Sequence, residues 1–199
     1  MVGYQTITVK NDRDGNIDIN EFRKAVSKNT AVIMITNPST LGVFEKNIEE
    51  IITLTHEFGA LAYYDGANMN ALMGKTSPGH MGFDIAHINV HKTLSTPHGG
   101  GGPGAGPVGV REFLNKYVSP GFAQTGIEYN HTSIKSYAGH ISVLLRAYCY
   151  IRSMGSQGLE QATEDAVLNA NYLMKKLSSW LPPAFNRPCM HEFVIDGSQ

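Results

Sequence analysis

The chain has 199 residues, of which 42% are hydrophobic and 17% charged, and its formal net charge is −1. This composition excludes a disordered chain and allows a sizeable buried core. A charge so close to zero creates no field that attracts nucleic acid or an anionic membrane, so we expect neither as a partner. No apolar run is long enough to span a membrane, and no signal peptide is visible.

The first 42 residues contain two predicted strands with a helix between them. Residues 6–10 alternate in polarity as a strand does. Asp18 can cap a helix, because Glu21 follows it at the spacing of a capping box. Residues 31–36 are a β-branched apolar run typical of a strand buried on both faces, and Pro38 then enforces a loop.

The next part of the chain repeats this order of helix and strand. Asn47 and Glu50 have capping-box spacing, and Gly59 is expected to end the helix that they begin. Two further apolar runs, 60–64 and 85–90, are predicted to be buried strands. Buried strands separated by helices indicate an α/β fold with a mostly parallel, doubly wound sheet.

The pattern changes after residue 107. Residues 108–110 form a short predicted strand and 111–118 a helix, which a long loop over 119–132 follows. A second helix is expected over 137–154, where Gly155 closes it.

Residues 159–180 are expected to form a long amphipathic helix, which a Pro-Pro pair stops. Residues 191–195 are predicted to form a strand, whose edges need partners. Cys149 and Cys189 are too few and too far apart for a disulfide framework or a zinc site, so we expect both to be buried thiols.

Two charged residues follow predicted strands. Asp65 comes directly after the run 60–64, and Lys92 lies just past the run 85–90 and before a glycine tract at 97–107. The carboxyl ends of parallel strands meet at one edge of a sheet, where ligands bind. Pyridoxal 5′-phosphate (PLP) requires such a pair, since a lysine holds its aldehyde as a Schiff base and a carboxylate pairs with its pyridinium nitrogen. The pattern therefore favours a PLP site.

Other interpretations of these residues have less support. The glycine tract lacks the Gly-Lys-Ser/Thr ending of a Walker-type phosphate loop. His87 and His91 are four residues apart, but on a strand this spacing holds them too far apart to chelate easily, so no metal is expected. Asp65 alone could be a turn residue, and Lys92 alone a surface lysine. No Gly-x-Ser-x-Gly nucleophile elbow is present.

Several longer stretches of the sequence resemble one enzyme family. The most specific are HINVHKT at 87–93 and HGGGGPG at 98–104, and the others lie at 36–42, 64–71, 146–155, 168–173 and 189–193. Together they resemble the P-protein of the glycine cleavage system, which is the PLP-dependent glycine dehydrogenase (decarboxylating). The resemblance covers nearly the whole chain, which is similar to an internal piece of the PLP-binding C-terminal half, or subunit 2, of that enzyme.

The resemblance implies the fold of a fold-type I PLP-dependent transferase. Residues 1–135 would form part of its PLP-binding large domain. Residues 136–199 would contribute long helices and the beginning of a small C-terminal α+β domain. The first strands of the large domain, the loop that cradles the phosphate and the side chain that stacks on PLP would all precede Met1.

The resemblance also implies roles for individual residues. Lys92 would be the catalytic residue and would hold PLP, while Asp65 would pair with the ring nitrogen. Ala67 would pack against one face of the ring, and His91 would reach the phosphate. The other expected cofactor-binding residues are Asn68 and Thr93.

The substrate implied by the resemblance is glycine. Its decarboxylation would leave an aminomethyl group, which would pass to the lipoylated carrier protein of the glycine cleavage system. The other P-protein subunit or half would be a partner in a dimer or heterotetramer, in the cytoplasm of a prokaryote or the mitochondrial matrix of a eukaryote. Two alternatives stay open: another fold-type I PLP enzyme, such as a lyase or aminotransferase, and a non-catalytic truncated subunit.

Overall fold

The computed structural model describes residues 3–102, 104–118, 139–195 and 197. The loop predicted over 119–132 and the domain boundary predicted at residue 135 lie outside these ranges. None of the described helices is both long enough and apolar enough to cross a membrane.

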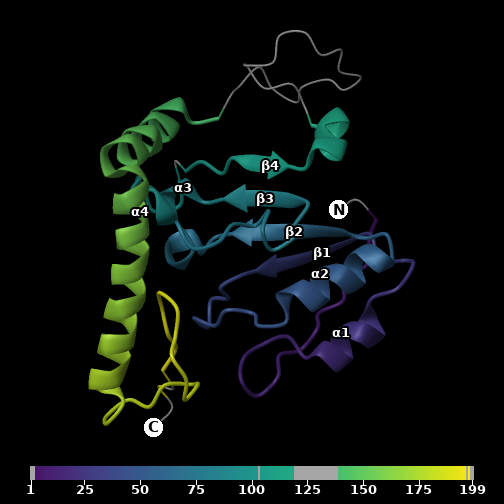
Figure 1. The fold of residues 1–199 in the computed structure, drawn as a ribbon, viewed down its shortest axis with the longest axis horizontal. Coiled ribbons are helices and arrows are strands. Elements are labelled where there is room, and N and C mark those ends of the chain that lie inside the picture. Colours follow the sequence, from purple (N-terminus) through teal and green to yellow (C-terminus); the bar gives the residue numbers. More distant parts are fainter. Residues whose placement is uncertain (1–2, 103, 119–138, 196, 198–199) are drawn as a thin grey trace.

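The centre of the fold is a four-stranded sheet in the order β1-β2-β3-β4. Its strands are β1 (Val32–Thr36), β2 (Leu61–Gly66), β3 (Ile85–Ile88) and β4 (Val108–Val110). The first three are parallel and β4 is antiparallel to β3, which confirms the predicted α/β fold with a mostly parallel sheet. Figure 1 shows β1, β2 and β3 pointing toward the long helix α4. The carboxyl ends of the parallel strands therefore face that helix.

One face of the sheet carries the hydrophobic core. Helices α1 (Ile19–Ala25) and α2 (Ile48–Glu57) pack against it, so that Ile51 and Tyr64 are completely buried (Figure 1). The hydroxyl of Tyr64 donates to the carbonyl of Asn37 at 2.7 Å, which satisfies the one polar atom of this side chain.

The other face of the sheet is open at β1. Side chains alternate along a strand, so Val32 and Met34 point away from the core that holds Ile35. Val32 is 50% and Met34 67% exposed. The prediction of a strand buried on both faces is wrong for β1, because both α1 and α2 lie on the Ile35 side.

The ends of the helices bear out part of the capping prediction. Asp18 accepts from the backbone N–H groups of Asn20 and Glu21 and caps α1, as predicted. The side chain of Asn47 makes no such bond at α2, so that prediction is wrong. The helix α2 nevertheless forms, and Gly59, with φ of 76°, follows its end as expected.

The two helices predicted on either side of Gly155 are joined into one element, α4 (Ile141–Leu177). Gly155 interrupts its helical backbone with φ of 63° and ψ of −177°, so two helices meet at a kink there. Val143 and Ala147 of α4 pack against Val90 of the short helix α3 (Val90–Thr93). This contact fastens α4 beside the carboxyl ends of the parallel strands.

Several local predictions are wrong. Residues 6–10 form no strand, and within the described part of the chain they pair with none. The region 191–195 has a single bridge, between Ile195 and Pro183, in place of a strand. Cys149 is exposed because it lies on the outer side of α4, whereas Cys189 is buried as expected. The helix predicted over 111–118 is present as a 3₁₀ helix, η2 (Glu112–Tyr117).

Candidate active site at the carboxyl end of the sheet

A row of three polar side chains crosses the carboxyl end of the sheet. Strand pairing places Thr36 of β1 beside Asp65 of β2, and Asp65 beside His87 of β3. Residues paired in this way point to the same face, so the aspartate has a neighbour on each side. This face is the one that α1 and α2 leave uncovered.

The carboxylate of Asp65 is the centre of this row. Its Oδ2 accepts the hydroxyl of Thr36 at 3.0 Å, and its Oδ1 accepts the backbone N–H of Ala67 at 3.2 Å. Nδ1 of His87 lies 3.3 Å from the same Oδ1. A carboxylate offers about four lone-pair positions, so the described contacts leave one acceptor position on Oδ2. The side chain is 22% exposed, which keeps that position accessible.

The segment after Asp65 is packed tightly against β3. A Cβ on Gly66 would lie 1.9 Å from the carbonyl oxygen of His87, so this position accepts no side chain. Ala67 and Asn68 are buried, at 8% and 6% exposure. The Asn68 amide donates to the carbonyl of Pro38 at 3.5 Å, which directs it toward the loop after β1. Of the predicted site residues, Asn68 therefore braces the backbone beside Asp65.

Lys92 lies one strand away, on the short helix α3. The strand predicted over 85–90 ends at Ile88, and the chain turns into α3 because Lys92 and Thr93 donate their backbone N–H groups to the carbonyl of Asn89. The Lys92 side chain is exposed, and its amine has no hydrogen bond or ion pair within the described residues.

Two hydrogen bonds tie the lysine segment to the aspartate segment. The backbone N–H of Asn89 donates to the carbonyl of Gly66 at 3.2 Å. The hydroxyl of Thr93, which is buried, donates to the side chain of Asn70 at 2.8 Å. Thr93 therefore joins α3 to the 3₁₀ helix η1 (Met69–Ala71), which follows Asp65 closely in the chain.

His91 lies between α3 and the glycine tract. Its ring meets the ring of His98 edge to face, with centroids 4.5 Å apart, and its Nδ1 is buried without a partner. Burial lowers the pKa of His91, and the nearby His98, Lys92 and His87 lower it further, which favours the neutral form of the ring. A neutral imidazole with one unused nitrogen can donate to an acceptor oxygen of a ligand.

The glycine tract bends around these histidines. Gly101 donates its backbone N–H to Nδ1 of His98 at 3.0 Å, and Gly101 and Gly102 have φ of 124° and 128°, which L side chains rarely adopt. A Cβ on Gly104 would lie 3.1 Å from Nδ1 of His91. The glycines are therefore required here by backbone conformation and by close approach to His91.

Thr36 and His87 belong to this site although the sequence did not single them out for it. The signal that could have found them is their position at the carboxyl ends of neighbouring predicted strands, one on each side of Asp65 in the sheet order. Over the ranges that the structure describes, no three His, Cys, Asp or Glu side chains converge to hold a metal ion.

Comparison with known proteins agrees with this fold. The aminotransferase class-V family matches residues 2–108, which contain the whole sheet up to the first residue of β4. The chain belongs to this family. Its members are fold-type I, PLP-dependent enzymes, so the predicted fold class is confirmed.

Several curated relatives share one name. A probable glycine dehydrogenase (decarboxylating) subunit 2 of Treponema denticola is 49% identical over 98% of this chain, and one of Thermosipho africanus is 51% identical over 98%. The chain spans 42% of the length of each of these relatives. It is a homologue of this subunit, as the resemblance of its motifs indicated.

A solved structure supports the architecture alone. The apo structure of cysteine desulfurase from Thermococcus onnurineus NA1 superposes with a TM-score of 0.64 and 18% identity, covering 92% of this chain and 48% of that one. At this identity the likeness shows a shared fold and no shared reaction.

Proposed function

We propose that this chain contributes the lysine and aspartate of the PLP site in a glycine-decarboxylating enzyme, glycine dehydrogenase (decarboxylating). The observation that carries the proposal is the Asp65 carboxylate, which is held from both sides yet keeps one acceptor position free. The unpaired amine of Lys92 follows the neighbouring strand. The identity of about 49% to subunit 2 relatives supports glycine as the substrate.

The described residues fit PLP in four respects. Asp65 offers a carboxylate oxygen for a protonated ring nitrogen, and the uncommitted amine of Lys92 is available to bond an aldehyde. The buried, unpartnered Nδ1 of His91 suits a phosphate oxygen. Ala67 carries only a methyl group next to the carboxylate, which suits a position against the face of a flat ring.

The chemistry divides between the cofactor and the chain. When bound, PLP supplies an electron-accepting ring that stabilises the charge left on glycine as CO₂ departs. Asp65 keeps a proton on the ring nitrogen, because its negative charge stabilises the cation beside it. Lys92 would hold the cofactor through its amine, and the same amine would move protons at the substrate carbon. Thr93 keeps α3 attached to η1, so both groups stay aligned.

The partners follow from the same proposal. The aminomethyl group passes to the lipoylated carrier protein, and the other glycine dehydrogenase subunit completes the site in a dimer or heterotetramer. The enzyme works in the bacterial cytoplasm, a proposal that the bacterial origin of the relatives from Treponema denticola and Thermosipho africanus supports.

The experiment is isotope exchange between bicarbonate and the glycine carboxyl group, with PLP, lipoylated carrier protein and the other subunit present. The polypeptide is expressed as its gene encodes it, with any flanking sequence. Exchange that requires PLP and that is lost in Lys92→Arg, which keeps the charge but removes the nucleophilic amine, is the expected result. Turnover of glycine by transamination alone, or exchange at wild-type rate in Lys92→Arg, would contradict the proposal.

A further inference from the structure

His87 has no role in the function proposed so far, yet its ring has close neighbours in three directions. Nδ1 lies 3.3 Å from Oδ1 of Asp65, and Nε2 lies 2.9 Å from Oδ1 of Asn89. A Cβ on Gly106 would lie 3.0 Å from Nε2 and Cδ2 of the ring, so the glycine tract packs directly against it. Three separate segments therefore define the position of this imidazole.

The register of the sheet explains why the ring faces Asp65. His87 is paired with Asp65 in the parallel β2–β3 ladder, as Asp65 is paired with Thr36 in the β1–β2 ladder. Thr36 occupies Oδ2, and His87 lies at Oδ1. Without the histidine, rotation of the carboxylate about its last side-chain bond would be limited only by Thr36 and the Ala67 N–H.

We propose that His87 is a positioning residue, which holds the Asp65 carboxylate so that its free Oδ2 position faces the ring nitrogen of PLP. This inference rests on the proposed function. His87 itself touches no reacting atom; it acts on the cofactor through Asp65. Asn89 holds the opposite side of the ring, because its side-chain oxygen lies 2.9 Å from Nε2.

The test compares replacements of His87 whose amide nitrogens take the places of different ring nitrogens. The amide nitrogen of asparagine can occupy the place of Nδ1, whereas that of glutamine extends to the place of Nε2. We therefore expect His87→Asn to keep most of the PLP affinity and exchange activity. His87→Gln should lose both, and His87→Leu should lose them most fully. A role in packing alone would favour glutamine and leucine, which fill more of the ring's volume.

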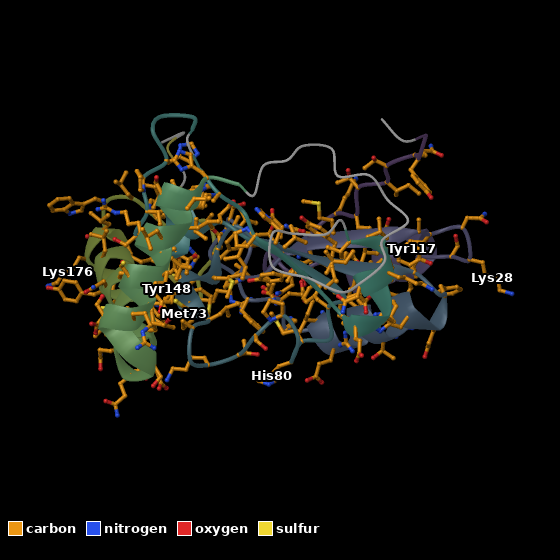
Figure 2. The ribbon with its side chains drawn as sticks, turned by 90° about the horizontal axis from the view of Figure 1, so that it is seen from above. Lys28, Met73, His80, Tyr117, Tyr148 and Lys176 are labelled. Carbon is orange, nitrogen blue, oxygen red and sulfur yellow. The ribbon has the colours of Figure 1, made fainter. Side chains whose placement is uncertain are left out.

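Two readouts separate positioning from general damage. The first is the PLP dissociation constant, followed by the visible absorbance of the bound cofactor. We expect His87→Leu to raise it about tenfold. The second is the exchange of glycine with bicarbonate, where kcat falls about tenfold and the KM for glycine stays unchanged. His80→Leu is the matched control, because His80 is exposed at the outer edge of the molecule (Figure 2) and should behave as wild type.

A double-mutant cycle decides whether His87 acts through Asp65. In an Asp65→Asn background, His87→Leu should change the PLP dissociation constant by less than about twofold, because the carboxylate that it positions is gone. A full tenfold effect in that background, or equal activity of His87→Asn and His87→Gln, would overturn the inference. If Asp65→Asn itself leaves PLP binding unchanged, or wild type binds no PLP, the proposed function fails as well.

Discussion

Replacing Asp65 by asparagine removes one negative charge and almost no volume. In the structure the carboxylate accepts from Thr36 and Ala67 and lies beside His87, with 22% of the side chain exposed. An asparagine oxygen can keep one of these two hydrogen bonds. Because the site is partly exposed, we expect a loss of folding stability of about 1 kcal/mol, so the variant should still fold.

The effect on the cofactor is larger. Two unit charges 4 Å apart interact by about 4 kcal/mol at the effective dielectric constant of about 20 that suits protein surfaces. Partial exposure screens the pair, so we expect PLP binding to weaken by about 2 kcal/mol, or roughly thirtyfold. Decarboxylation should suffer more, because asparagine cannot keep the ring nitrogen protonated. A barrier increase of about 4 kcal/mol corresponds to a rate roughly a thousandfold lower.

The assay measures PLP affinity, glycine–bicarbonate exchange and the melting temperature on the same preparations. Thr36→Val is the control, since it removes a hydrogen-bond donor from Oδ2 and leaves the charge in place. We expect it to lower exchange tenfold or less. Near-normal exchange in Asp65→Asn, or a larger loss in Thr36→Val than in Asp65→Asn, would show that Asp65 is not the partner of the ring nitrogen.

Three further outcomes follow from the structure. Gly66→Ala places a Cβ 1.9 Å from the carbonyl oxygen of His87 and should lower the free energy of unfolding in urea by about 3 kcal/mol or more. Gly109→Ala is the control and should change it little, because nothing lies within 4 Å of that Cβ. Similar unfolding midpoints for the two variants would refute the contact. Burial lowers the pKa of His191, although Glu192 opposes the shift. The free energy of unfolding, measured by chemical denaturation, should therefore fall as the pH drops below about 6.5. The fall should be smaller in His191→Gln. Apolar side chains are exposed on β1 and α4, so the isolated 199 residues should bind a hydrophobic dye, aggregate and bind PLP weakly. A monomer that melts cooperatively and decarboxylates glycine unaided would contradict this.

The sequence predicted those features of the fold that depend on local pattern. Apolar runs located β1, β2 and β3, and Asp18 and Gly59 marked helix ends, because capping and positive φ are properties of single positions. At Asn47 the expected cap is absent, and the backbone N–H is bound by a side chain two residues earlier, which is itself held by a residue distant in the chain. Glu45 accepts the N–H of Asn47 at 2.9 Å and that of Ile17 at 2.6 Å, a pairing that only the folded structure brings together.

The site could be predicted to the level of strand ends and no further. Asp65 and Lys92 stand out because each follows an apolar run, which is a local signal. The contacts of Asp65 with Thr36 and His87 depend on the register between neighbouring strands. The sequence of one strand alone does not determine that register. The open face of β1 could not be predicted for a similar reason. A β-branched run has the same sequence pattern whether other elements cover one face of the strand or both.

The central claim is that Lys92 binds PLP, and reduction with borohydride followed by peptide mapping tests it most directly. The reduced cofactor should be found on Lys92 alone, whose amine makes no ion pair within the described residues. Lys75 is the internal control, because Glu160 binds its amine at 2.8 Å. An adduct on Lys75 or Lys116 in place of Lys92 would contradict the account.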